Sequence, residues 1–359
     1  MTTAAGLSQT FWSGRRVFVT GHTGFKGGWL MGLLARLGAR PSGYALAPPS
    51  EPNVFTAAGV ERLGPSTIGD IRDGQRLLAA METAEPEIVL HLAAQALVRP
   101  ARADPIETFS TNVLGTAQVL EAVRKTPGVE ACVVVTSDKV YDNVEWSWAY
   151  RETDRLGGKE PYGASKACTE IVVESYRASY FGADGHRARI ASARAGNVIG
   201  GGDWAEDRLI PDAIRAFSAG EALLIRNPSS VRPWQHVLEP LSGYLRLAEA
   251  LVSDAGLPAP HAFNFGPAAD DAVPVRVIAD EISTRWGAGA SWRHDARYQP
   301  YEARLLEVDS AKARTLLGWQ PRWRLAAALD RTVAWYRAFY AGEDMQAVML
   351  RQIDEYLHG

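Results

Sequence analysis

The chain is poor in cysteine and has no long apolar run. Its 359 residues include only Cys132 and Cys168, so we expect free thiols in a reducing compartment rather than a disulfide framework. No stretch approaches about eighteen consecutive apolar residues, and the N-terminal segment lacks a positively charged start followed by an apolar block. We therefore expect a cytoplasmic protein with no membrane span.

The chain also lacks a large excess of either charge, and its histidines lack the spacing of metal ligands. There are 38 basic and 41 acidic residues, for a formal net charge of −3, which gives no reason to expect nucleic-acid binding. The seven histidines are scattered without the spacing of a zinc site, so we expect no metal. At this length, one large domain with a smaller one is the expected organisation.

A glycine-rich run lies between a short apolar segment, 16–20, and an amphipathic helical pattern that ends near Leu37. The run is Gly21-His22-Thr23-Gly24-Phe25-Lys26-Gly27. Its glycines are spaced GxxGxxG, and side chains must be absent where backbone N–H groups approach a pyrophosphate at a helix N-terminus. This arrangement predicts a dinucleotide site that includes Gly21, His22, Gly24, Phe25, Lys26 and Gly27.

Further apolar segments alternate with helical patterns as far as about residue 195. They predict an α/β fold of the Rossmann type, with a doubly wound parallel sheet. We assign residues 1–195 to the dinucleotide-binding domain, with later strands returning from about 232–265. Residues 196–359 are then mainly a smaller, mixed substrate-binding domain, interleaved with the first.

The ends of the predicted strands supply further cofactor contacts. Leu92, Ala93 and Ala94 are small or apolar residues that let backbone approach a flat cofactor, and His91 before them reads as a core histidine. Asp70, followed by Ile71, either reaches an adenine or closes a turn. The strand near 42–46 ends with neither the acid that favours NAD nor an arginine for NADP, so these residues leave that choice open.

A polar break after the apolar segment 132–135 predicts the reaction centre. The segment runs into Ser137, Asp138 and Lys139, at the strand end where open α/β sheets place ligands. Tyr162 and Lys166 follow on a helix that starts at Pro161. They are four residues apart, so they share a helix face, and the ammonium is expected to lower the pKa of the phenol from its usual value of about 10.

Several longer runs resemble a known family. They are Phe11-Trp12, VTGHTGFKG (19–27), TSDKVY (136–141), RAGNVIGGGDW (194–204) and VRPWQHVLEP (231–240). With the glycine loop, Asn112 and the YxxxK pair, they resemble the extended short-chain dehydrogenase/reductase superfamily and, within it, the CDP-glucose 4,6-dehydratase family. The resemblance extends from about Phe11 to Trp323.

The resemblance implies a tightly held NAD that is regenerated in each turnover. Tyr162 would deprotonate the C4 hydroxyl of CDP-glucose, and Ser137 would bind the C4 oxygen. Lys166 would lower the pKa of Tyr162 and hold the nicotinamide ribose. Asp138 would then protonate the departing C6 hydroxyl, and hydride would return to C6 to give CDP-4-keto-6-deoxyglucose.

Two roles are open to Lys139, and one of them is that of the base for the C5 proton. Related dTDP-glucose dehydratases have a glutamate where this chain has Lys139, as the CDP-glucose family does. Lys139 is either the base, which requires a depressed pKa, or a cation that fixes Asp138 or binds phosphate. We expect the base role.

The family also implies substrate contacts and a partner. Gln95, Asn197, Arg208 and Arg232 are expected to contact the nucleotide sugar, and Asn264 to line the sugar pocket. The helices that start near Pro105 and Pro161 would pair with a second copy, giving a homodimer or higher homo-oligomer. Segments 208–211, 231–236 and 293–304 are rich in Arg, Trp and Pro, which suits a nucleoside diphosphate or simply structural packing.

Two alternatives remain open from the residues. One is another nucleotide-sugar enzyme on the same scaffold: a 4-epimerase, a reductase, or a dehydratase acting on a different nucleotide. The other is a non-catalytic protein that senses NAD(P), against which an intact Tyr162 and Lys166 argue.

Overall fold

A parallel sheet lies at the centre of the computed structural model, which describes residues 2–182, 185–253, 257, 261–287, 289–297 and 303–359. Its strands are β1 (Arg16–Thr20), β2 (Arg40–Ala45), β3 (Ser66–Ile68), β4 (Ile88–His91), β5 (Ala131–Val135), β6 (Arg189–Ala195) and β11 (Ala262–Phe265). The order across the sheet is β3-β2-β1-β4-β5-β6-β11, and all neighbours are parallel. This doubly wound order confirms the predicted fold class, with the switch point between β1 and β4.

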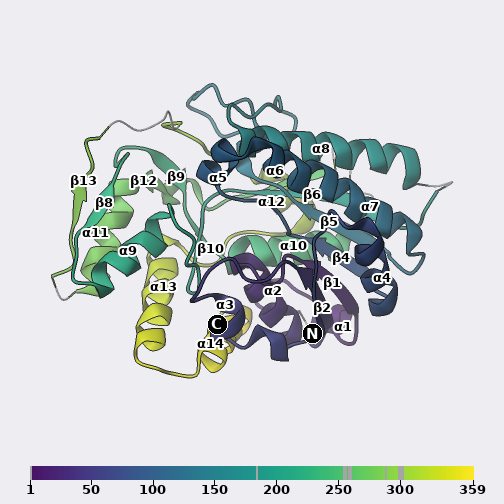
Figure 1. Ribbon diagram of the computed structural model, residues 1–359, viewed down its shortest axis with the longest axis horizontal. Helices are drawn as coiled ribbons and strands as arrows, with labels where there is room; N and C mark the ends of the chain where they lie inside the picture. Colours follow the sequence, from purple (N-terminus) through teal and green to yellow (C-terminus); the bar gives the residue numbers. More distant parts are fainter. Residues whose placement is uncertain (1, 183–184, 254–256, 258–260, 288, 298–302) are drawn as a thin grey trace.

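Helices cover both faces of the sheet (Figure 1). One face carries α2 (Phe25–Arg36) and α10 (Leu238–Val252), with α14 (Met345–His358) packed on α2. The other carries α4 (Gly74–Ala84), α7 (Gly115–Lys125) and α8 (Pro161–Tyr180). Strand residues alternate between the two cores: Val133 joins the first and Cys132 and Val134 the second. Both faces of the central strands β4 and β5 are thus buried, which explains their continuous apolar segments.

The helix predicted to start at Asp104 is confirmed, but it is not continuous. Asp104 caps α6 (Pro105–Phe109) by accepting from Glu107 N at 2.9 Å. The chain then widens into a π-helical turn, η2 (Ser110–Leu114), before α7 begins. Such turns are frequent at functional sites. Here the turn contains Asn112, whose amide donates to Gln95 O and Ser165 Oγ.

The C-terminal half builds a smaller domain beside the sheet (Figure 1). α12 (Ala311–Leu317) packs on β11 and α10 at the sheet, and the longer helices of the smaller domain are α9 (Leu209–Ser218), α11 (Val275–Trp286) and α13 (Leu325–Tyr340). Its strands pair as β8 (Leu223–Ile225) with β13 (Trp292–His294), β9 (Val231–Pro233) with β12 (Ala272–Pro274), and β7 (Val198–Ile199) with β10 (Gln235–His236). The interleaving goes further than expected, because α14 returns to the sheet and Leu357 O accepts from Ala4 N at 2.8 Å.

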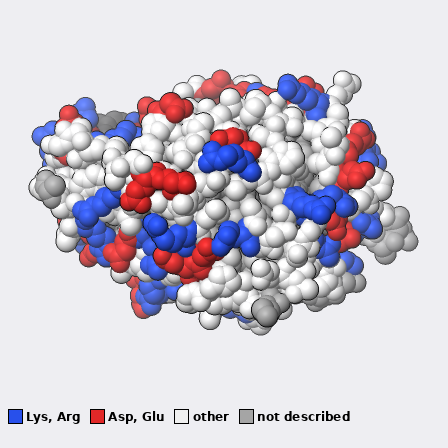
Figure 2. Space-filling model, turned by 90° about the horizontal axis from the view of Figure 1, so that it is seen from below, with Lys and Arg blue, Asp and Glu red and all other residues white. Residues whose placement is uncertain are grey.

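Short helical segments complete the N-terminal half. They are α1 (Gln9–Trp12), α3 (Val54–Ala57), η1 (Val60–Arg62), α5 (Val98–Ala103) and η3 (Asp138–Val140). Within the described ranges, no helix is long and apolar enough to cross a membrane. The face shown in Figure 2 carries basic and acidic side chains interspersed.

A buried ion pair attaches α8 to β6, and its loss has a measurable cost. Arg194 donates to Glu170 from Nε at 3.0 Å and from Nη2 at 2.8 Å, and both side chains are about 95% buried. We predict that Glu170→Ala lowers the free energy of unfolding by about 3–5 kcal/mol, because it leaves a buried guanidinium without its partner. Urea-induced unfolding measures this loss.

Glu174→Ala on the same helix is the matched control. Glu174 pairs with Arg177 at the surface and is 57% exposed, so its removal should cost less than about 0.5 kcal/mol. Equal losses for the two variants would contradict the importance of the buried pair.

Candidate active site

The glycine loop has the shape that a dinucleotide requires. Gly21 has φ +80°, and a Cβ there would lie 2.7 Å from Ala93 N. A Cβ on Gly27 would lie 2.0 Å from Gly21 O. The loop therefore packs closely against itself and the end of β4, leaving the N-terminus of α2 available to a pyrophosphate.

The ring of His22 does not line the predicted dinucleotide site, while a contact of its backbone with the cofactor stays a prediction. Its ring is fully buried, and its Nε2 lies 2.6 Å from Ser66 Oγ. A Cβ on Gly43 would lie 2.2 Å from that ring, and burial lowers the pKa of His22 to about 4. The ring packs between β2 and β3, so only the backbone of His22 can line the dinucleotide site.

The residues predicted to contact the cofactor at the ends of β3 and β4 differ in how well the structure suits them to that role. The Asp70 carboxylate accepts from Arg72 N at 2.8 Å and from the Arg72 guanidinium, and these hydrogen bonds lower its pKa. Asp70 thus has the turn role that the sequence allowed, while its contact with an adenine stays a prediction. Ile71 is buried. His91 is the expected core histidine, lying 2.6 Å from Thr20 Oγ1 and 3.0 Å from Thr116 Oγ1.

The reaction centre forms at the carboxyl end of β5. Ser137 Oγ donates to Asp138 Oδ1 at 3.1 Å and accepts from Lys139 N at 3.2 Å, and Ser137 lowers the pKa of the Tyr162 phenol. Asp138 is 2% exposed, and its Oδ2 has no hydrogen-bond partner among the described residues. Burial raises the pKa of Asp138, opposed by Lys139, Ser137 and Arg232. A buried carboxyl with a raised pKa can hold a proton that it later donates.

The expected effect of Lys166 on Tyr162 is not what the structure shows. Burial raises the pKa of Tyr162 to about 12, and the groups that oppose this rise are Ser137 and Arg208. Lys166 instead donates to Val135 O at 3.0 Å, and burial lowers its own pKa to about 8. Desolvation of the phenolate outweighs the benefit of a cation one helical turn away.

Lys26 belongs to the reaction centre as well as to the glycine loop. Its Nζ donates to Tyr244 OH at 3.2 Å. Burial and Arg208 lower the pKa of Lys26 to about 7, while the nearby Asp138 raises it. Sequence reasoning missed Tyr244, which is fully buried on α10. Nothing in the sequence relates it to residues so distant along the chain.

Glu170 is a second residue that sequence reasoning missed. It lies four residues after Lys166 on α8, so the helical period could have indicated it. Its carboxylate accepts from the hydroxyls of Thr136 and Ser192 as well as from Arg194. Arg194 holds its pKa low against the effect of burial. Glu170 thus ties the YxxxK helix to the strand end that precedes Ser137.

Two predicted substrate residues lie near the reaction centre. Arg208 pairs with Asp203 at 2.9 Å and lowers the pKa of Tyr162. Arg232 is 8% exposed and lowers the pKa of Asp138. Asn197 is half-buried in the loop after β6, where its carbonyl accepts from Gln235 N at 3.2 Å.

Asn264 and Gln95 are less suited to their predicted roles. Asn264 is fully buried; its Oδ1 accepts from Tyr141 OH at 2.7 Å, and its amide donates to two backbone carbonyls. The side-chain amide of Gln95 donates its two hydrogens to Leu97 O and Thr108 Oγ1. Asn264 is therefore a structural residue, contrary to expectation, and Gln95 shapes the loop after β4.

Trp204 and Trp234 pack in the hydrophobic core rather than line a cleft. Trp204 contacts the rings of Trp335, Tyr336 and Phe339 and is 7% exposed. Residues 298–302 of the segment 293–304 lie outside the described residues.

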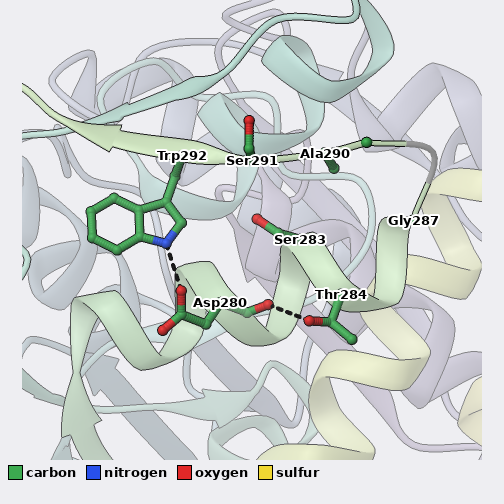
Figure 3. Close-up of a pocket in the computed structure, with 8 residues that line it drawn as sticks. Asp280, Ser283, Thr284, Gly287, Ala290, Ser291 and Trp292 are labelled. Carbon is green, nitrogen blue, oxygen red and sulfur yellow. Dashed lines mark hydrogen bonds between the residues drawn. The ribbon is translucent and has the colours of Figure 1, made fainter.

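A separate cavity of about 430 Å³ lies between α11 and β13 (Figure 3). Trp292 Nε1 donates to Asp280 Oδ1 at 2.7 Å at its edge. None of the residues predicted for the active site lines it.

Comparisons with known proteins agree with this geometry. The chain is 49% identical to the CDP-glucose 4,6-dehydratase of Salmonella typhimurium, over 98% of each protein. UDP-glucose 4-epimerase from Brucella ovis in complex with NAD superposes with a TM-score of 0.77 at 25% identity, covering 89% of this chain and 97% of that one. The dTDP-glucose 4,6-dehydratase from Bacillus anthracis in complex with NAD has the same fold, with a TM-score of 0.75 at 20% identity, covering 93% and 99%.

The model of the NAD dependent epimerase/dehydratase family matches residues 17–266. This match runs from β1 to the end of β11 and includes the glycine loop, Ser137-Asp138-Lys139 and the YxxxK helix. The chain therefore belongs to the NAD dependent epimerase/dehydratase family.

Proposed function

We propose that the protein is a CDP-glucose 4,6-dehydratase that uses NAD. The observation that carries this proposal is the buried Asp138 carboxyl, whose Oδ2 has no hydrogen-bond partner among the described residues and whose Oδ1 accepts from Ser137. An epimerase has no need of a proton donor for a leaving hydroxyl. The relative that is 49% identical over almost the whole chain is itself a CDP-glucose 4,6-dehydratase.

The residues divide the proposed reaction between them. The glycine loop and the N-terminus of α2 would hold NAD, which would supply the hydride chemistry of the reaction. Tyr162 removes the C4 hydroxyl proton, and Ser137 binds that oxygen. Lys166, one helical turn after Tyr162 on α8, holds the nicotinamide ribose. Oxidation at C4 acidifies C5, so that Lys139 can remove its proton while Asp138 protonates the departing C6 hydroxyl.

The nucleotide sugar would lie between the two domains. Arg208 and Arg232 come from the C-terminal half and lower the pKa values of Tyr162 and Asp138, respectively, which supports a role for both guanidinium groups beside the reacting sugar. We propose that they bind the diphosphate, since guanidinium groups match phosphate oxygens.

We also propose that residues 1–195 with the strands returning at 232–265 form the NAD domain, and that 196–359 supply mainly the substrate domain.

We also propose that the cell keeps this protein in its cytoplasm. Cys132 is buried and Cys168 partly buried, both are free, and burial raises the pKa of the Cys132 thiol to about 12. Free thiols are usual in a reducing compartment. Recovery of the protein from the periplasm in cell fractionation would contradict this assignment.

The substrate is tested by incubating the purified protein and NAD with CDP-, dTDP-, GDP- and UDP-glucose. We predict that mass spectrometry shows loss of one water from CDP-glucose alone. In Asp138→Asn, bound NADH should still form while water loss slows at least about 100-fold, because the proton donor is gone. In Tyr162→Phe, no NADH should form. Unchanged water loss by Asp138→Asn would remove the carboxyl from its proposed role.

The base is tested by exchange of the C5 proton with D2O. We predict that Lys139→Met slows this exchange, because it removes the amine beside Asp138. Lys26→Met is the matched variant, since it removes a second amine of the reaction centre, the one whose pKa is lowered to about 7. Exchange lost only in Lys26→Met would make Lys26 the base and Lys139 a supporting cation.

We propose a homodimer formed by α8 and by α6 with η2, which pack side by side. Ile106, Leu114 and Ile171 are 77%, 63% and 61% exposed there, and exposed apolar patches mark interaction sites. Ile171→Glu should convert the dimer to a monomer in sedimentation velocity, because it places a charge in the interface. Leu316→Glu, on α12 and 39% exposed, is the control that should leave the mass unchanged. A dimer that persists in Ile171→Glu would place the interface elsewhere.

A further inference from the structure

The two oxygens of the Asp138 carboxyl have different surroundings. Oδ1 accepts from Ser137 Oγ at 3.1 Å, and that hydroxyl is itself fixed by Lys139 N at 3.2 Å. Oδ2 is buried and has no hydrogen-bond partner among the described residues. A buried carboxyl oxygen without a donor favours the neutral acid, because the charged form would lose its solvation without compensation. The surroundings of Oδ2 therefore bear on whether Asp138 holds the proton that the proposed elimination requires.

Gly196 lies close to Oδ2, in the loop that follows β6. A Cβ on Gly196 would lie 2.5 Å from Asp138 Oδ2, 3.3 Å from Asp138 Cγ and 2.9 Å from Cγ of Pro233 on β9. The φ angle of Gly196 lies outside the left-handed region, so backbone strain does not call for a glycine here. It is the carboxyl and the proline ring that leave no room for a side chain.

The loop and the strand that carry Gly196 and Pro233 are held together. Asn197 O accepts from Gln235 N at 3.2 Å, and β7 pairs with β10 just beyond these residues. Pro233 itself lies in the pairing of β9 with β12. A methyl group added at position 196 would therefore displace the carboxyl rather than the loop or the strand. The Asp138 side chain is short, so it could turn away only by giving up the hydrogen bond at Oδ1.

The groups at this place offer Oδ2 no polar hydrogen. Proline has no backbone N–H, and the Gly196 bond that takes the Cβ direction is a C–H bond. An N–H here would stabilise the carboxylate and favour loss of its proton. Resting on the function proposed above, we propose that Gly196 is a positioning residue for the elimination: without a side chain, it leaves room beside Pro233 for the Asp138 carboxyl in the orientation that protonates the C6 hydroxyl.

The proton transfer that this placement serves balances within the proposed reaction. The O–H bond of Asp138 breaks as its proton bonds to the C6 oxygen, and the C6–O bond breaks with its electron pair on the departing water. The electron pair of the C5–H bond forms the C5=C6 double bond, and the C5 proton goes to the base. Gly196 exchanges no atom in this step and acts only through the carboxyl of Asp138.

The test is Gly196→Ala, incubated with NAD and CDP-glucose. The absorbance of bound NADH reports oxidation at C4, and mass spectrometry after rapid quench reports water loss. We expect NADH to form at nearly the unaltered rate while water loss slows at least about 10-fold, because a displaced carboxyl no longer meets the C6 oxygen. NADH should therefore accumulate on the enzyme, which a general loss of structure would not produce.

Two further comparisons separate positioning from packing. Gly128→Ala is the matched control, because a Cβ there would lie 3.5 Å from Pro86 O, which is an ordinary contact, and it should change neither step. In an Asp138→Asn background, Gly196→Ala should slow water loss no further, because the carboxyl through which Gly196 acts is already absent.

Unchanged water loss in Gly196→Ala would overturn the proposal, as would equal slowing of both steps or a further slowing in the Asp138→Asn background. Should Gly196→Ala not fold, Pro233→Ala decides. It removes the ring that bounds the same space and frees the carboxyl to turn, so water loss should slow with NADH formation intact. Unchanged water loss or equal slowing of both steps would again overturn the proposal. Absence of product from the unaltered protein with every nucleotide hexose is a different result, since it rejects the proposed function itself.

Discussion

The buried pair between Glu170 and Arg194 is the interaction on which the active-site architecture depends. It joins the middle of α8 to β6, and Glu170 also accepts from Thr136, the residue before Ser137. The two halves of the reaction centre, the end of β5 and the start of α8, therefore share one anchor. Because removing one partner of such a pair leaves an uncompensated charge, Ser137 and Tyr162 are held in register by electrostatics as well as packing.

Burial then decides the protonation states at this anchored site. The same exclusion of water raises the pKa values of Asp138 and Tyr162 and lowers those of Lys26 and Lys166. Each group is pushed toward its neutral form, since charge is costly in a region of low dielectric. A neutral carboxyl suits a proton donor, so the burial of Asp138 serves the acid side of the proposed elimination.

The C-terminal half contributes charge to a site built mainly by the sheet. Arg208 and Arg232 approach the reaction centre from the smaller domain, and Tyr244 reaches Lys26 from α10. The aromatic residues of that half mostly support this arrangement: Trp204 packs on Trp335 and Tyr336 beside Asp203, the partner of Arg208. Trp204 and Trp335 therefore pack in the core and support Asp203 and its partner Arg208, and they do not form a surface on which a nucleotide base could stack.

The sequence by itself determined the sheet, the glycine loop and the Ser137–Asp138 and Tyr162–Lys166 pairs. These features are local: strand period, turn glycines and i, i+4 spacing are written over a few consecutive residues. Only the tertiary structure decided that the His22 ring turns away from the dinucleotide site, that Asn264 is structural, and that Lys26 joins Asp138. Those outcomes depend on contacts between segments far apart in the chain, such as Gly43 with His22, Tyr141 with Asn264 and Tyr244 with Lys26. The pKa of Tyr162 belongs with them, because helical spacing shows a nearby cation but not the desolvation that outweighs it.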